Sequence, residues 1–259
     1  MNNEFLICSI ENKVATVTIS HSPGNKLNTR VYQEITQLME ELEADENVKA
    51  IVITGDGEEA FVAGADINEM VDLDTVGMMD LTQITRTSYS KIENLNKPVI
   101  AAINGEARGG GFELALCCDL RIASENAQFA FPEINLGVIP GGGGTQRIQK
   151  AVGQGIAKEL LYFGETIDAE RAYQLQIVNK VVDKEELLST AIEWAEKLTE
   201  KAPVALRMMK LAVNTGANVD LESALTIEAT SYDGVFATQD RKEGMAARVE
   251  NRKPNYEGR

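Results

Sequence analysis

Alternating apolar and polar residues at the start of the chain predict a β-hairpin. The stretches FLICSI and VATVTI, residues 5–10 and 14–19, are separated by the turn-like ENK. The following segment, TRVYQEITQLMEELEAD, has apolar residues at helical spacing, at Val31, Ile35, Leu38, Met39 and Leu42. KAIVITGDGE then has the pattern of a buried strand followed by a turn. An antiparallel beginning therefore leads into a β-then-α order.

This order recurs along the first two thirds of the chain. A helical stretch near residues 78–95 leads to the strand pattern KPVIAAING, and ARGGGFELALCCD then supplies a helix before the strand pattern DLRIAS. The result is a weak repeat of strand, loop and helix, without a strict sequence repeat.

From residue 145 onward the pattern is mainly helical, interrupted by one further strand, IVNKVV. Asp183 is a predicted N-cap for KEELLSTAIEWAEKLTEK, and Pro203 occupies a permitted first-turn position of the next helix. Two more helices are predicted over residues 219–236 and 239–250. We therefore predict an α/β fold with a core over residues 1–190 and a helical region over residues 191–259, packed on the core or on a neighbouring subunit.

Composition narrows the class of protein. With 259 residues and 44% hydrophobic content, the chain can bury a substantial core. Its formal net charge of -15 disfavours a general nucleic-acid or anionic-membrane surface. No run approaches the roughly 20 apolar residues of a membrane span, and the N-terminus lacks an export pattern, so we expect a cytoplasmic protein.

The cysteines and the single histidine restrict the chemistry further. Cys8, Cys117 and Cys118 show no C-x-x-C spacing, which predicts reduced structural thiols without disulfides or a zinc site. His21 is the only histidine and lies beside SPGN, as expected of an ordinary loop residue. Most mechanisms with a histidine base are thereby disfavoured, and no metal site is expected.

The first segment that could carry chemistry is AFVAGADINEM, residues 60–70. Asp66 followed by Glu69 fits a capping box, so a helix is predicted from about Ile67. The N–H of Ala65 then lies just outside the helix, beside Gly64, where it could face a ligand oxygen. On this segment alone, a capped helix without further function is the favoured interpretation.

The second segment is ARGGGFELALCCD, residues 107–119, in which three glycines precede an acid. Glycines at a strand-to-helix junction let the backbone approach a ligand, and free N–H groups at a helix start favour negative charge. Gly110 is the predicted donor, and Glu113 lies about one turn later on the same face. The alternative is that the glycines serve close packing and that Glu113 reaches solvent.

The third segment, QFAFPEINLGVIP, surrounds Glu133 with apolar residues. Such surroundings are expected to raise the pKa of a carboxyl group, which suits a proton donor near neutral pH. Two acids in unlike settings suggest a base and an acid. The alternative is a loop glutamate that caps or pairs locally.

The fourth segment, PGGGGTQR, residues 140–147, resembles a phosphate loop only superficially, because no Gly-Lys-Ser/Thr ending follows. We expect these glycines to form a tight backbone surface beside a small ligand, with Thr145 capping the following helix.

Taken in order, AFVAGADI, NGEARGGGFELALCCDLRIAS and AQFAFPEINLGVIPGGGGTQR resemble the signature series of the crotonase, or enoyl-CoA hydratase/isomerase, superfamily. The ending, RKEGMAARVENRKPNYEGR, also resembles the terminal helix of that family. The resemblance implies a spiral of ββα turns followed by a helical region used in trimer assembly, commonly with two trimers forming a hexamer.

The resemblance also implies an activity. Within this family, two backbone N–H groups bind the thioester oxygen, and these positions fall on Ala65 and Gly110. The two acids of the hydratase subgroup correspond to Glu113 and Glu133. The implied reaction adds water to a trans-2-enoyl-CoA and gives a 3-hydroxyacyl-CoA, with no cofactor besides the coenzyme A of the substrate. The alternatives are an isomerase or another acyl-CoA lyase of the same fold, and a noncatalytic acyl-CoA-binding protein.

Substrate contacts follow from the same resemblance. They are expected along two backbone segments and at two further positions: Asn25, Lys26 and Leu27; Ala63, Gly64, Asp66 and Ile67; Phe131 and Gly141. Candidates for the coenzyme's phosphates are Lys26, Arg30, Arg248, Arg252 and Lys253. The acyl pocket is expected to depend on residues 71–83.

Overall fold

The large sheet is the frame of the molecule. The computed structural model describes residues 3–259, and within them six strands pair in the order β1-β2-β3-β5-β7-β10. These are β1 (Leu6–Glu11), β2 (Val14–Ile19), β3 (Ala50–Gly55), β5 (Val99–Ile103), β7 (Leu120–Ser124) and β10 (Lys180–Val182). β1 and β2 form the predicted antiparallel hairpin, and the other pairs are parallel. The predicted hairpin and the predicted β-then-α order are both confirmed.

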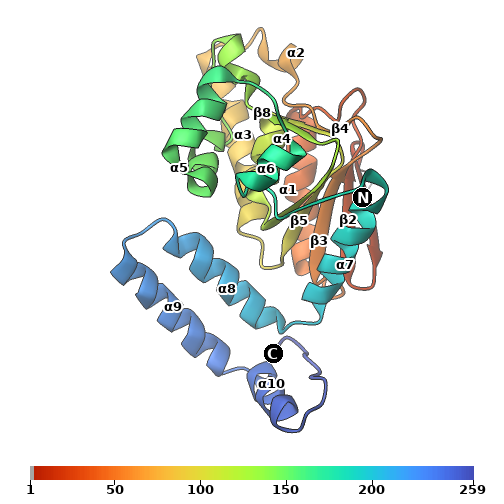
Figure 1. The fold of residues 1–259 in the computed structure, drawn as a ribbon, viewed down its shortest axis with the longest axis vertical. Helices are drawn as coiled ribbons and strands as arrows, with labels where there is room; N and C mark the ends of the chain where they lie inside the picture. Colours follow the sequence, from red (N-terminus) through yellow and green to blue (C-terminus); the bar gives the residue numbers. More distant parts are fainter. Residues whose placement is uncertain (1–2) are drawn as a thin grey trace.

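A second, smaller sheet was not predicted from the sequence. Its order is β4-β6-β8-β9, formed by β4 (Ala60–Val62), β6 (Glu106–Arg108), β8 (Gln128–Ala130) and β9 (Ile167–Asp168). Strands of two or three residues are too short to show a period of two. Each of β4, β6 and β8 follows a strand of the large sheet, so the chain alternates between the two sheets as a spiral (Figure 1).

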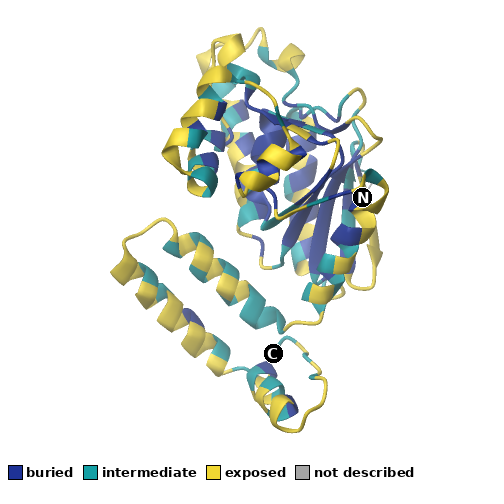
Figure 2. Cartoon of the chain, viewed as in Figure 1, coloured by how far each residue is buried: buried dark blue, intermediate teal, exposed yellow. Residues whose placement is uncertain are grey.

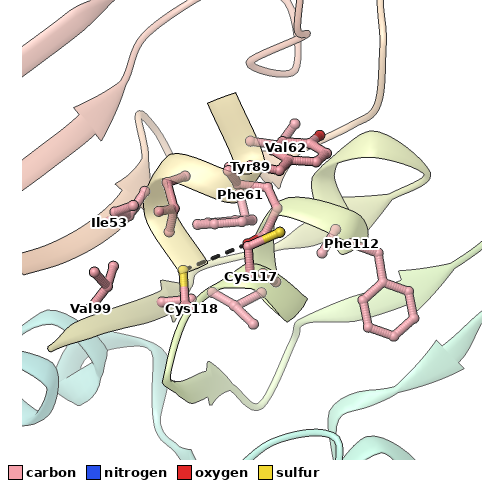
Figure 3. Packing of buried hydrophobic residues seen from close by; sticks show 14 of the residues in the cluster. Ile53, Phe61, Val62, Tyr89, Val99, Phe112, Cys117 and Cys118 are labelled. Atoms are coloured by element: carbon pink, nitrogen blue, oxygen red, sulfur yellow. Dashed lines mark hydrogen bonds between the residues drawn. The ribbon is translucent and has the colours of Figure 1, made fainter. Parts of the chain in front are cut away.

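Helices cover the large sheet on both faces. On one side lie α1 (Thr29–Ala44), α3 (Thr75–Glu93) and α4 (Gly110–Cys117), whose apolar residues join the main core cluster. Figure 3 shows part of this cluster, in which Phe61 lies beside the free thiol of Cys117. On the other side, α7 (Leu187–Thr199) contacts β2, β3, β5 and β7. The central strands β3 and β5 are completely buried between these layers, whereas the edge strand β1 is mostly exposed (Figure 2).

Several predicted helix starts differ from the observed ones. α5 (Gly144–Phe163) begins without a side-chain cap, so Thr145 does not cap it. Asp183 precedes the short 3₁₀ helix η2 (Lys184–Glu186), and α7 begins only at Leu187. Asp66 does cap α2 (Ile67–Met70), but Glu69 accepts a hydrogen bond from Thr29 N at 2.8 Å. The capping box is therefore half formed, because Glu69 ties α2 to the start of α1.

The C-terminal helices project from the core. They are α8 (Pro203–Gly216), α9 (Leu221–Phe236) and α10 (Gln239–Val249), with α6 (Ala169–Gln174) lying earlier against the core. Figure 2 shows mostly exposed or intermediate positions on α8, α9 and α10. The predicted boundary at residue 190 falls inside α7, whose Ala191 and Ala195 are buried on the sheet. We therefore place the start of the projecting region at Pro203.

No helix among residues 3–259 has the length and apolar character needed to cross a membrane. Over the same residues, no cluster of three or more His, Cys, Asp or Glu side chains is arranged to hold a metal ion.

Candidate active site

The small sheet brings three distant segments together. β4, β6 and β8 run parallel, so their carboxyl ends meet at one edge. Ala65 follows β4, Gly110 follows β6, and Glu133 follows β8 in the 3₁₀ helix η1 (Pro132–Leu136). Loops at the carboxyl ends of parallel strands are a common place for binding sites in α/β proteins. β4, β6 and β8, which the sequence did not predict, therefore bring Ala65, Gly110 and Glu133 to one edge.

Two backbone N–H groups at this edge lack an acceptor among residues 3–259. Ala63 N donates to Gly24 O and Asp66 N donates to Leu27 O, whereas Ala65 N, between them, has no such bond. Gly110 is the first residue of α4, where an N–H has no partner within the helix. A Cβ placed on Gly110 would lie 3.6 Å from Ala65 N, so the two peptide groups are close in space. Both are free to donate to one ligand oxygen.

Glycine is required at positions 109 and 111, because neighbouring atoms occupy the space that a side chain would need. Gly109 has a φ of +47°, and a Cβ there would lie 2.8 Å from Glu133 Oε1. A Cβ on Gly111 would lie 2.0 Å from Val62 O, because α4 starts directly against β4. Larger residues at either position would separate Glu133 or β4 from the start of α4.

Glu113 is buried and firmly held. Its side chain is only 3% exposed, and Oε1 accepts hydrogen bonds from Gly142 N at 2.9 Å and Gly144 N at 2.7 Å. Burial raises the pKa of this carboxyl, while the Gly144 and Gly142 amides and the charge of Arg147 oppose the rise. The alternative that Glu113 reaches solvent is therefore wrong.

Glu133 lies in a different environment. Burial is the main cause that raises the pKa of Glu133 to about 7; a hydrogen bond from its own backbone N–H opposes the rise, and the nearby Glu113 carboxylate adds to it. Its Oε2 is buried without a hydrogen-bond partner among the described residues. Buried polar atoms are normally paired, so an unpartnered carboxylate oxygen in a cavity points to a ligand or a water molecule as its partner. The alternative of local capping or pairing is not seen for this oxygen.

The run of glycines at residues 141–144 encloses Glu113. A Cβ on Gly142 would lie 2.4 Å from the Tyr89 ring and 2.7 Å from Glu113 Oε2, and one on Gly144 would lie 2.8 Å from the Phe131 ring. A Cβ on Gly143, whose φ is +111°, would lie 2.1 Å from Arg147 Nη1. These glycines make the tight backbone surface expected from the sequence, but three of them pack on protein side chains.

A cavity of about 570 Å³ connects these groups. Glu113, Glu133, Ala65 and Gly110 all line it. Much of its remaining wall is apolar and comes from α2, α3 and the loop after η1: Met70, Met78, Leu81, Val138 and Ile139. An apolar cavity with a few convergent polar groups is the usual form of a small-molecule site. Residues 78, 81 and 82 lie within the segment expected to shape the acyl pocket.

The other expected substrate contacts divide into two groups. Six of them line the cavity: Leu27, Ala63, Gly64, Asp66, Ile67 and Gly141. Asn25, Lys26 and Phe131 do not line it. Asn25 is buried, and its side chain donates to Asp56 O and Ala60 O at 2.9 Å. These bonds hold the loop before α1 against the segment between β3 and the start of β4. Phe131 is 1% exposed and stacks on Phe112 behind the glycine run, so we no longer expect it to contact the substrate.

The five candidate phosphate-binding cations lie outside the cavity lining. Arg30 pairs with Glu34, Arg252 with Glu243 and Glu250, and Lys253 with Glu200. Arg248, on α10, lies at the opposite end of the molecule from α2, which borders the cavity (Figure 1). Within one chain, the cations of the C-terminal segment do not approach the site.

Sequence reasoning missed two residues behind the site. Tyr89 is completely buried, and its hydroxyl donates to Gly110 O at 2.6 Å. Arg147 donates to Gly142 O at 2.9 Å. The final Arg of PGGGGTQR was visible in the sequence, but nothing marked its partner, and Tyr89 has the spacing of an ordinary core residue.

Comparison with known proteins agrees with this geometry. The model of the family described as enoyl-CoA hydratase/isomerase matches residues 9–259. The chain belongs to the enoyl-CoA hydratase/isomerase family. Two relatives of this family are a short-chain-enoyl-CoA hydratase of Clostridium acetobutylicum, 44% identical over 98% of this chain and 97% of the relative, and a crotonyl-CoA hydratase of Syntrophomonas wolfei, 43% identical over 99% of both.

A solved structure of the enoyl-CoA hydratase/isomerase family supports the fold. The enoyl-CoA hydratase of Bacillus anthracis superposes with a TM-score of 0.95 at 38% identity, over 99% of this chain and 100% of that one. The predicted crotonase-like spiral of ββα turns is thereby confirmed.

Proposed function

We propose that this chain is an enoyl-CoA hydratase that adds water across the C2=C3 bond of a short trans-2-enoyl-CoA and gives a 3-hydroxyacyl-CoA. The observation that carries the proposal is one cavity lined by two unpaired N–H groups and two carboxyl groups in unlike environments. The two relatives are named as hydratases, one of short-chain enoyl-CoA and one of crotonyl-CoA, and this supports the same reaction and chain length here.

In the proposed mechanism, the thioester oxygen binds between the N–H groups of Ala65 and Gly110. Attack of water at C3 pushes negative charge onto that oxygen, which then binds these donors more strongly. One preorganised donor of this kind typically contributes about 3 to 4 kcal/mol to transition-state stabilisation. The helix start at Gly110 favours the same charge.

The two acids divide the proton transfers. Glu113 orients the water and accepts its proton, because hydrogen bonds from Gly142 and Gly144 favour the carboxylate. Glu133 delivers a proton to C2, because its pKa of about 7 keeps a substantial protonated fraction near neutral pH. Each proton transfer typically contributes about 10² to 10⁴-fold. The chemistry uses protein groups and the substrate's own thioester, and no cofactor is part of the proposal.

A hydration assay tests the proposal. Purified chain is incubated with crotonyl-CoA, and loss of the enoyl thioester absorbance is followed for the wild type, Glu113→Gln and Glu133→Gln. We expect fast hydration that falls by about 10² to 10⁴-fold in each variant.

Two outcomes would change the assignment. A wild type inert on short, medium and branched enoyl-CoAs would remove the hydratase function. Impairment of Glu133→Gln alone would favour isomerase chemistry, which does not require Glu113.

We also propose that copies of the chain associate through the projecting helices as a trimer or a pair of trimers. α8 and α9 carry large exposed apolar side chains, among them Met209, Val213, Leu221, Leu225 and Tyr232. Such a surface is unusual for a monomer. A native mass measurement is expected to give three or six copies, and a monomeric mass would contradict this proposal.

A further inference from the structure

We propose that Arg147 is a positioning residue for the reaction. It holds the peptide group between Gly142 and Gly143 so that the N–H groups on either side of it keep Glu113 Oε1 in place. This inference deepens the proposed hydratase function and rests on it. Arg147 does not line the cavity, so its effect passes through the glycine run.

The contacts of Arg147 fix its guanidinium from two sides. Nη1 donates to Gly142 O at 2.9 Å. Nε and Nη2 donate to the two carboxylate oxygens of Glu93 at 3.2 and 2.6 Å, which is the bidentate arrangement that suits arginine. The side chain is 17% exposed. A partly buried, bidentate ion pair has a defined geometry, so it can hold a backbone carbonyl in one position.

The glycine run is built around this contact. Gly142 N and Gly144 N are the two donors to Glu113 Oε1, and the carbonyl that Arg147 binds lies between them in the chain. A Cβ on Gly143 would lie 2.1 Å from Nη1, so glycine at this position leaves the space that the guanidinium occupies. If the carbonyl moves, both amides move with it, and Glu113 loses its support.

Glu93 is itself anchored to the helical region. It is the last residue of α3, and Asn214 of α8 donates to its carbonyl oxygen at 3.0 Å. Lys210 of α8 binds Asp119 at 2.8 Å and also reaches Ile92 O at 3.4 Å. These contacts with α8 hold the end of α3, and with it Glu93, in position to pair with Arg147.

The charge of Arg147 also acts on Glu113 and lowers the pKa of that carboxyl. The other titratable groups that face Glu113 are Tyr32 of α1, Tyr89 of α3, Cys117 of α4 and Glu133 of η1. Burial raises the pKa values of both tyrosines and of the thiol, so these three are uncharged near neutral pH. Arg147 is thus the cation that acts on Glu113 among these groups.

Two substitutions and a matched control test the inference in the full chain. Arg147→Met removes the charge and the hydrogen bonds, and Arg147→Lys keeps the charge but loses the bidentate fork. Arg121→Lys is the control, because Arg121 is also partly buried and donates to the backbone carbonyls of Ile177 and Cys118, away from the cavity. The readouts are kcat and KM on crotonyl-CoA, the pH profile, thermal unfolding, and hydrogen exchange of residues 141–144.

We expect Arg147→Met to lower kcat by about 10²-fold, as misplacement of a catalytic group does, with KM changed less than about twofold. The acid limb of kcat/KM should move to higher pH in Arg147→Met and stay in place in Arg147→Lys, because the pKa of Glu113 rises when the cation is lost. Hydrogen exchange at residues 141–144 should become faster in both variants. Arg121→Lys should lower the unfolding temperature but leave kcat, KM, the pH profile and the exchange rates of residues 141–144 unchanged.

The inference is overturned if both Arg147 variants keep the wild-type kcat and exchange rates, if the loss lies only in KM, or if Arg121→Lys gives the same loss. If Arg147→Met does not fold, Arg147→Lys and Glu93→Gln decide the question by the same readouts. An inert wild type would remove the proposed hydratase function, and the exchange comparison would still support or overturn the positioning role by itself.

Discussion

Glu113 and Glu133 are the same residue type on two contrasting elements. Glu113 projects from the buried helix α4, is 3% exposed, and has two backbone donors on one oxygen. Glu133 lies on the short 3₁₀ helix η1, most of whose residues are exposed, and one of its oxygens has no partner among the described residues. The first carboxyl is held by the protein, while the second is left for a ligand.

This contrast explains how two identical side chains could do opposite work. Burial alone raises the pKa of both carboxyls. Glu113 has the amides of Gly142 and Gly144 and the charge of Arg147 to favour its charged form, whereas Glu133 has only its own backbone amide, and the negative charge of Glu113 disfavours ionisation of Glu133. The additional donors and the cation thus suit Glu113 to act as the base, while fewer donors and the charge of Glu113 suit Glu133 to act as the acid.

The largest effect is expected where the support of Glu113 is removed. In Gly142→Ala, the new Cβ would lie 2.4 Å from the Tyr89 ring and 2.7 Å from Glu113 Oε2. We expect displacement of the loop and a fall in kcat of about 10²-fold, comparable with other misplacements of a catalytic group. Steady-state kinetics on crotonyl-CoA measure this change.

Gly155→Ala is the matched control. Gly155 lies in α5, the helix that follows the glycine run, and a Cβ there meets no atom within 4 Å. It should keep the wild-type kcat and gain up to about 1 kcal/mol in stability, because alanine is the better helix former. A kcat in Gly142→Ala equal to that of this control would show that the glycine run does not support Glu113.

The same contrast limits what the sequence could predict. β2 was found by its alternation of apolar and polar residues, β3 and β5 by their short apolar runs, and α1 by its spacing of apolar residues. β4, β6 and β8 have three residues each and carry no periodic signal, although they bring the site together. Their pairing comes from contacts between residues far apart in the chain, which local patterns do not contain.

Within the site, the sequence predicted which residues meet but not what holds them. Glu113 and Gly110 stood out because an acid and three glycines are unusual in an apolar run. The glycines of PGGGGTQR were expected to face a ligand, yet Gly143 and Gly144 pack on Arg147 and Phe131. Phe131 likewise stacks on Phe112 and does not line the cavity, because a large apolar side chain next to a buried strand belongs to the core.

The smallest expected effect sharpens the contrast through stability. The pKa of Glu133 is raised from 4.5 to about 7 in the folded chain, so ionising it there costs stability. Below pH 4.5 the group is protonated in both folded and unfolded states, and the cost appears as pH rises from about 4.5 through about 7. Glu133→Gln removes this cost, so it should raise the unfolding temperature at pH 8 and change it little at pH 4.5. The gain should be a few degrees, at about 2 to 4 °C per kcal/mol for a chain of this size.

The unfolding temperature of Glu113→Gln should rise less than that of Glu133→Gln, because the amides of Gly142 and Gly144 already offset the cost of the Glu113 charge. Calorimetric scans of both variants at the two pH values measure the difference, and an equal gain for both would mean that the two carboxyls share one environment.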